Sequence, residues 1–280
     1  MASLKAISMR MKSVANIGKI TSAMKMVSTA KFKHDERRYN AGKPFSDPVV
    51  KFYEKLPPMD SSSLPALKMV VLSSDKGMCG GINSGLAKSV RVKAIEEEQA
   101  GTAVELMCCG SKAQAALKRN LGNRFSSSSF EEIQAVPFNF TTASMLAESA
   151  MAGEPARINV VHNHFQSMIA YEPLNVPVYT KKAVKNVAPP EWSKAVDQYN
   201  FEPPTWEVWD DLQEFYTACA IYGKYLDGII SEQSARMAAM DNASKNSDEI
   251  VDKLTLQYNR GRQARITTEL CEIIAGASAQ

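Results

Sequence analysis

Residues 222–258 read YGKYLDGIISEQSARMAAMDNASKNSDEIVDKLTLQY, a stretch without proline whose large apolar side chains recur every three, four or seven positions. This spacing predicts one helix with an apolar stripe. All 13 prolines lie between Pro44 and Pro204, so residues 1–43 and 205–280 contain none. Because proline in a helix interior breaks the helix, both ends of the chain are free to form long helices.

The N-terminal segment has the same helical rhythm, and at 1.5 Å per residue the two helices would be about 60 Å and about 100 Å long. Such lengths indicate a coiled coil. Its seam is imperfect, since Gln233, Ser244 and Ser247 fall where a tight seam carries leucine or isoleucine, which predicts loose pairing there. The apolar stripe of the first helix consists of Leu4, Ile7, Met11, Val14, Ile17, Met24 and Val27.

The middle of the chain alternates between strand and helix patterns, which is typical of a parallel sheet covered by helices. Short apolar runs predict buried strands at residues 68–72, 103–108 and 157–161. Helical patterns separate them at residues 85–98, 112–121 and 142–151.

The predicted fold class is therefore α/β, with long terminal coiled-coil helices and a central, Rossmann-like α/β domain whose sheet is mainly parallel. We place the first helix at residues 1–57, the central domain at 65–190 and the last helix at 205–280. Residues 61–64 and the proline-rich stretch 187–204 are interpreted as linkers.

The composition describes a folded chain rather than a disordered or fibrous one. It has 280 residues, of which 45% are hydrophobic and 22% are charged. No apolar run approaches the roughly 18 residues that span a bilayer. The five cysteines include no C-x-x-C pair, which argues against a zinc site or a disulfide framework.

The net positive charge of the chain is concentrated in the first predicted helix. Residues 1–43 carry ten basic residues against two acids, Asp35 and Glu36. We interpret this face as solvated or as facing an acidic protein. A basic coiled-coil protein that binds nucleic acid or an anionic membrane surface remains an alternative, although no aromatic residues are interleaved to stack on bases.

Residues 73–81 read SSDKGMCGG, follow a predicted strand and open a helix, where α/β proteins often bind phosphate. The segment lacks both glycine-rich nucleotide-binding patterns, and no acidic residue ends the second strand to hold a ribose. We interpret it as a structural turn with a small buried cysteine at Cys79. A nucleotide-binding α/β enzyme is the other alternative.

Two further groups of residues could carry chemistry. His162 and His164 would point to one face of a strand and could share a metal, but no third ligand is evident in the sequence. We interpret them as surface or packing residues. Cys108 and Cys109 would alternate across their strand, one inward and one outward, as packing residues.

The end of the last helix changes character along its length. A basic stretch that ends at Arg265 precedes an apolar stripe, and small residues follow from Ala275 to Ala279. An exposed apolar tip is a liability unless another protein sheathes it, and small side chains could turn within such a sheath.

Three blocks of the sequence resemble the gamma subunits of rotary ATP synthases: residues 12–27, residues 73–84 and residues 231–279. The last contains Ser-Ala-Arg-Met at 234–237, Met-Asp-Asn-Ala at 240–243 and Ile-Thr-Thr-Glu-Leu at 266–270. Gly18 departs from the family, which usually has a better helix former there. The cost of about 1 kcal/mol predicts a soft point in the first helix.

The resemblance implies an antiparallel coiled coil that stands as a rotor shaft inside a ring of alpha and beta subunits, which hold the nucleotides and do the chemistry. The chain itself would have no catalytic residue, cofactor or metal. Matching family positions assign rotor-to-stator contacts to Met24, Lys25, Arg236, Arg262, Gln263 and Thr267, and the bearing tip to Leu270, Ile273, Ile274 and Gly276.

The same resemblance implies the partners and the location. The partners would be the alpha and beta subunits, the small central-stalk subunits (delta and epsilon) and the membrane c-ring, with no nucleic acid and no direct membrane insertion. The wording of residues 231–245 is similar to mitochondrial members. We therefore expect a mature chain on the matrix side of the mitochondrial inner membrane.

Overall fold

The computed structural model describes residues 4–57, 64–126, 138–187 and 190–278. It divides the chain into two compact units, one formed by Met1–Thr29 with Arg236–Gln280 and the other by Ala30–Ala235. Two long helices, α1 (Leu4–Lys55) and α7 (Thr205–Ser278), contribute to both units. Residues 30–55 and 205–235, parts of these helices, belong to the unit that contains the sheet.

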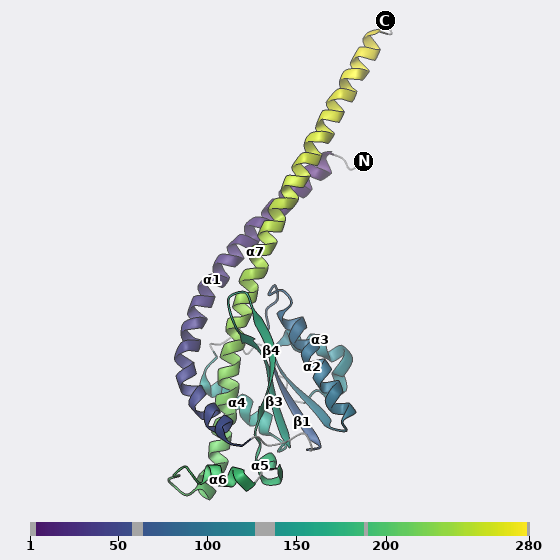
Figure 1. Ribbon diagram of the computed structural model, residues 1–280. Coiled ribbons are helices and arrows are strands. Elements are labelled where there is room, and N and C mark those ends of the chain that lie inside the picture. The colour runs from purple at the N-terminus through teal and green to yellow at the C-terminus, as the bar shows by residue number, and fades with distance from the viewer. Residues whose placement is uncertain (1–3, 58–63, 127–137, 188–189, 279–280) are drawn as a thin grey trace. The chain divides into compact units, whose positions relative to one another are not determined.

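The first unit is an antiparallel pair of helices (Figure 1). Lys25 contacts Asp241, Met11 contacts Thr255, and a side chain at Gly261 would meet Leu4. Residues with lower numbers on α1 thus pair with residues with higher numbers on α7, so the two helices run antiparallel. This confirms the coiled coil of the terminal helices. Beyond Gly261, α7 continues for about five more turns.

The seam of this pair is tight at the position where loose pairing was predicted. A Cβ atom built on Gly18 would lie 3.2 Å from the Cβ of Ser247, closer than most side-chain contacts. The prediction of a loose seam at Ser247 is therefore wrong, whereas the soft point at Gly18, which rests on helix propensity, stays a prediction. Two small residues allow the backbones to approach, so Gly18 is a packing residue.

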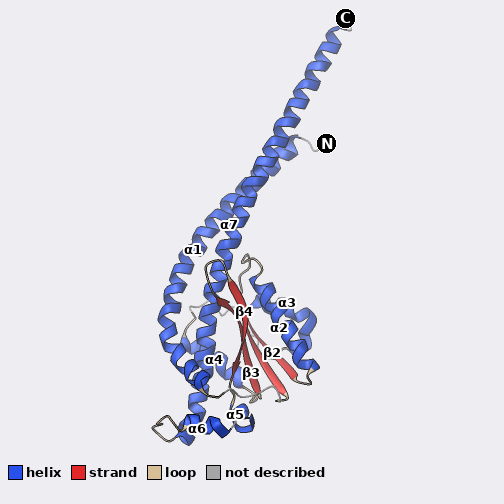
Figure 2. Ribbon diagram, in the orientation of Figure 1, coloured by secondary structure: helices blue, strands red, loops and turns tan. Residues whose placement is uncertain are grey.

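The second unit contains a four-stranded sheet in the order β2-β1-β3-β4 (Figure 2). β1 (Ala66–Leu72) pairs in parallel with β2 (Ala103–Cys109) and β3 (Arg157–Phe165). β4 (Tyr171–Val178) pairs with β3 in the antiparallel direction. The three predicted strands and the mainly parallel sheet are confirmed.

Helices cover both faces of this sheet. α2 (Ile82–Gln99) and α3 (Ser111–Leu121) pack on the face that carries Met69, Leu106 and Val161. α4 (Phe140–Met151) and parts of α1 and α7 pack on the other face. Because β2 is covered on both sides, Cys108 and Cys109 are both buried, and the prediction that one points outward is wrong.

The segment of α1 that packs in this unit contains Pro44 and Pro48 without ending the helix. Each proline removes one backbone hydrogen bond, but aromatic packing holds the helix in place. The Tyr53 ring stacks on Tyr216 of α7 with centroids 3.8 Å apart, and Tyr53 is fully buried.

Three elements were missed by the pattern of the sequence. β4 contains Pro173 and Pro177, and proline is tolerated there because β4 is an edge strand. α5 (Lys181–Val187) ends where the stretch interpreted as a linker, residues 187–204, begins, and α6 (Pro190–Val196) lies inside that stretch. Trp192 of α6 is buried in the core, so this stretch is a packed part of the unit. Most of the other predicted linker, residues 61–64, lies outside the described residues.

No helix in the described part of the chain has an apolar stretch that could cross a membrane.

Candidate functional site

The free end of α7 exposes a stripe of large apolar side chains. Every described residue from Arg262 to Ser278 is exposed. Four of them are large aliphatic residues that lie on one side of the helix by their spacing. Their exposed fractions are 57% for Ile266, 54% for Leu270, 68% for Ile273 and 59% for Ile274. An apolar stripe of this kind marks a surface that another protein covers.

The residues predicted to make contacts differ in exposure. Arg262, Gln263, Thr267 and Gly276 are exposed, and Met24 is half-buried. Thr267 donates its hydroxyl hydrogen to the Gln263 carbonyl, so its methyl group is the part left for a partner.

Two predicted contacts already interact within the chain. The ammonium group of Lys25 is bonded to Asp241, although 47% of the Lys25 side chain stays exposed. Arg236 is only 7% exposed, so little of its side chain is available at the surface of the unbound chain.

A basic groove lies at the base of the exposed tip, between the start of α1 and α7. Lys5 and Lys12 of α1 face Arg262 and Arg265 of α7 across it, and Glu269 is the one acid in the lining. Glu269 bonds to Arg265 at 2.7 Å. Leu4, Met9 and Ile266 supply the apolar part of the wall. The groove combines positive charge with apolar area and so fits an acidic segment of a protein.

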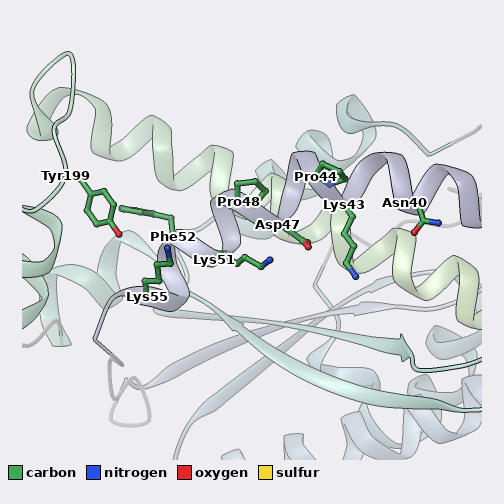
Figure 3. Close-up of a pocket in the computed structure, with 9 residues that line it drawn as sticks. All are labelled: Asn40, Lys43, Pro44, Asp47, Pro48, Lys51, Phe52, Lys55 and Tyr199. Atoms are coloured by element: carbon green, nitrogen blue, oxygen red, sulfur yellow. The ribbon is translucent and has the colours of Figure 1, made fainter.

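A second basic surface follows α1 in the other unit (Figure 3). Lys43, Lys51 and Lys55 extend from this helix, with Asp47 as the one acid among the lining residues. The rings of Phe52 and Tyr199 close one end, with centroids 5.0 Å apart. Since all lining residues except Tyr199 belong to one helix, the surface is shallow and fits a protein edge better than a small molecule.

Polar groups of the turn at residues 73–81 form hydrogen bonds with other residues of the chain. Asp75 accepts a hydrogen bond from the Ser111 N–H, and the Ser73 hydroxyl oxygen accepts one from the Ala113 N–H, so two free donors at the start of α3 are occupied. Asn83 donates to the Ser74 hydroxyl oxygen at 2.7 Å.

The space beside this turn is too small for a nucleotide. The cavity that Ser73, Ser74 and Asn83 help to line measures about 10 Å³, room for a single water molecule. The geometry therefore favours a structural turn over a phosphate site. Burial raises the pKa of the Cys108 thiol to about 12 and raises that of Cys109 too, which suits packing rather than redox chemistry.

The two strand histidines have a third partner that the sequence did not reveal. Asp227 of α7 lies 2.6 Å from His164 Nδ1 and 3.3 Å from His162 Nε2 through the same carboxylate oxygen. Burial alone would raise the pKa of Asp227, but hydrogen bonds from both histidines and from the Phe165 N–H outweigh it and lower the pKa. Burial lowers the pKa of His162, which keeps its imidazole neutral. The prediction that these histidines are plain surface or packing residues missed this cluster.

Comparison with known proteins gives consistent matches along the whole chain. A family model described as ATP synthase matches residues 3–280. The mitochondrial ATP synthase subunit gamma of Drosophila melanogaster is 38% identical, and the match covers 100% of this chain and 91% of the relative. The corresponding mitochondrial F(1) complex subunit gamma of Rattus norvegicus is 36% identical, with 99% of each chain covered.

Solved structures agree with these relatives. A chain of the Tetrahymena thermophila mitochondrial ATP synthase central stalk and c-ring matches with a TM-score of 0.65 and 27% identity, over 80% of this chain and 99% of that one. A chain of the Euglena gracilis mitochondrial ATP synthase matches with a TM-score of 0.76 and 17% identity, over 99% of this chain and 94% of that one, which supports the fold.

Proposed function

This chain belongs to the ATP synthase gamma-subunit family, and we propose that it is the central rotor shaft of a mitochondrial-type ATP synthase and carries no active site of its own. The observation that carries the proposal is the free end of α7. It exposes four large aliphatic side chains next to a basic groove, in the part of α7 that extends beyond the end of α1. That surface is built to be enclosed by other subunits.

The shaft acts through differential contact. A single asymmetric helix pair inside a ring of three alpha and three beta subunits touches each catalytic subunit differently. Contacts that differ between the open and closed states of a catalytic site are the only ones that can bias those states. As the shaft turns with the membrane c-ring, the bias passes from site to site, which links rotation to ATP synthesis and hydrolysis.

The chemistry belongs to the ring on this account. Support comes from the turn at residues 73–81, where Asp75 and the Ser73 hydroxyl accept hydrogen bonds from backbone N–H groups at the start of α3. Support also comes from the small cavity beside it, which cannot hold a nucleotide.

We assign contacts with the ring to Arg262, Gln263, Thr267, Met24 and the exposed part of Lys25. Arg236 is assigned a contact through the small part of its side chain that remains accessible. The bearing tip consists of Leu270, Ile273, Ile274 and Gly276. In this arrangement the arginines meet acidic edges of the ring, and the aliphatic tip turns in an apolar collar without interlocking.

The remaining partners follow from family membership. The second unit, with its sheet and the shallow basic surface on α1, is assigned to the small central-stalk subunits and the c-ring. The complex lies on the matrix side of the mitochondrial inner membrane, where this chain is held through its partners.

The proposal is tested by purifying the tagged chain from its source and measuring partner stoichiometry by mass spectrometry and ATP hydrolysis in the same fraction. We expect one copy of the chain for three alpha and three beta subunits, together with hydrolysis. A chain that purifies alone, with no hydrolytic partner, would contradict the proposal.

A further inference from the structure

The cluster of His162, His164 and Asp227 lies in the second unit, and the cavity beside it shares Lys43, Asp47 and Lys51 with the basic surface on α1. β3 and α7 hold the three side chains together. His162 and His164 are two positions apart on β3, and both contact Asp227 of α7. One ligand atom from each residue lies within 4.8 Å of the other two.

We propose that His162, His164 and Asp227 form a binding site for a divalent transition-metal ion, of which zinc fits the ligands best. Two imidazoles and one carboxylate are a ligand set that zinc favours, whereas magnesium and calcium prefer oxygen ligands alone. Ligand atoms around a tetrahedral zinc ion lie roughly 3.3 Å apart. The His162 to Asp227 distance already has this value, and the His164 to Asp227 distance of 2.6 Å has to open by less than 1 Å.

The orientation of the carboxylate is fixed by a neighbouring group. Asp227 Oδ1 accepts a hydrogen bond from the Phe165 N–H at 2.9 Å, which leaves Oδ2 directed at both histidines. Groups that hold a ligand in this way raise metal affinity because the ligand loses less freedom on binding. His162 is fully buried and Asp227 nearly so, and the surrounding side chains keep both in place.

A cavity gives the ion a path to the site. It measures about 200 Å³, and both His164 and Asp227 line it. The side chain of His164 is 39% exposed, so this ligand can move to admit an ion. The cavity also has room for water at the remaining coordination positions. Asp47, Glu54 and Asp227 together balance the charge of the three lysines in its wall, so an arriving cation meets no net positive barrier.

The ion would clamp β3 to α7 inside the second unit. An ion that binds the folded chain and not the unfolded one raises the unfolding temperature increasingly as its concentration exceeds the dissociation constant. This inference does not depend on the rotor function.

The test uses the full chain without a polyhistidine tag, freed of metal with a chelator. Cys271 is the exposed cysteine and could bind zinc by itself, so all samples carry Cys271→Ser. Zinc is titrated by calorimetry, and cobalt is added separately for its absorption spectrum. We expect one ion per chain, a cobalt spectrum of nitrogen and oxygen ligands, a higher unfolding temperature with zinc, and no effect of magnesium.

His164→Ala is the main variant because this residue is partly exposed, and Asp227→Asn is the second because it keeps the shape of the side chain. Both should weaken zinc binding by roughly tenfold or more and abolish the zinc-dependent rise in unfolding temperature. His34→Ala is the matched control, since His34 is the third histidine of the chain and is 69% exposed. Zinc binding that is absent, or equally tight in His164→Ala, would overturn the proposal.

Discussion

Lys25 Nζ lies 2.6 Å from an Asp241 carboxylate oxygen and thereby joins the first and last helices across 216 positions of the sequence. Lys245 binds the other oxygen of the same carboxylate at 2.7 Å. The contact lies next to Met24, so it fixes which face of each helix is left for a partner.

The ion pairs of Asp241 with Lys25 and Lys245 predict how the stability of the chain depends on pH. Hydrogen bonds from Lys245 and Lys25 lower the pKa of Asp241 from 3.8 to about 2. Because the pKa is lower in the folded chain, the ionised carboxylate stabilises the fold at every pH above its pKa in the unfolded chain. This stabilisation is lost as the pH falls through its pKa in the folded chain.

Asp241→Asn should therefore lower the urea midpoint at pH 5, and the difference from the wild type should shrink only as the pH falls below 3.8 toward about 2. Urea unfolding across this range measures it. Asp252→Asn, an exposed aspartate of the same helix, is the control. A difference that is equal at every pH would show that the charge of Asp241 is not the cause.

The close approach of Gly18 and Ser247 predicts a size limit in the seam. Gly18→Leu should destabilise the chain by about 1–3 kcal/mol, because the added side chain has to push the helices apart. Gly228 of α7 is the control, because a Cβ atom there would meet nothing within 4 Å.

Gly228→Ala should stabilise the chain by about 1 kcal/mol through helix propensity alone. Gly18→Ala should gain less than this because of the 3.2 Å contact with Ser247. Thermal unfolding of the wild type, Gly18→Leu, Gly18→Ala and Gly228→Ala measures these differences. A Gly18→Leu chain as stable as the wild type would contradict the tight packing of the seam.

The stacked pair Tyr53 and Tyr216 predicts opposite effects for the same substitution. The Tyr53 hydroxyl is buried and has no hydrogen-bond partner in the part of the chain that the structure describes. The Tyr216 hydroxyl has a hydrogen bond with the backbone of Tyr179. Burial raises the pKa of both phenols, so both stay neutral.

Tyr53→Phe should be neutral or stabilising by up to about 1 kcal/mol, because it removes an unpaired buried polar atom. Tyr216→Phe should cost about 1 kcal/mol, because it removes a bonded one. Chemical denaturation measures both free energies of unfolding, and an equal loss in the two variants would contradict the assignment.

The sequence predicted the long helices and the buried strands well, because their signals are periodic and local. It missed β4 because Pro173 and Pro177 are strong breakers everywhere except at a sheet edge, and the edge position is set by the fold. It also missed the partner of His162, since Asp227 is 65 positions away and only the packing of α7 on β3 brings them together.

The sequence also could not show which side chains are exposed. Arg236 and Arg262 look alike in the sequence, but the first is buried and the second is exposed. The sequence suggested weakness at Ser247 because a tight seam carries leucine or isoleucine there, and at Gly18 because glycine is a poor helix former. The structure shows that their small size is what allows close packing.

The exposed tip predicts a loss of coupling on truncation. Every described residue that a chain ending after Gly261 would lose is exposed, so the free energy of unfolding should change by no more than about 0.5 kcal/mol. The assembled complex should transmit less torque, because the bearing contacts that we propose for Leu270, Ile273 and Ile274 would be gone. Ile273→Ser with Ile274→Ser, which keeps the helix length, should have a smaller effect in the same direction. Unchanged torque in the truncated complex would contradict the assigned tip.

The most direct test of the rotor function is to watch the chain turn. Lys118 is exposed on α3, so Lys118→Cys in a Cys271→Ser background gives a labelling site distinct from the four buried cysteines. A bead is attached there and the alpha and beta ring is fixed to a surface. Our account predicts that the bead rotates continuously in one direction when ATP is added and stops when ATP is removed. A bead that stays fixed while the same complexes hydrolyse ATP would contradict it.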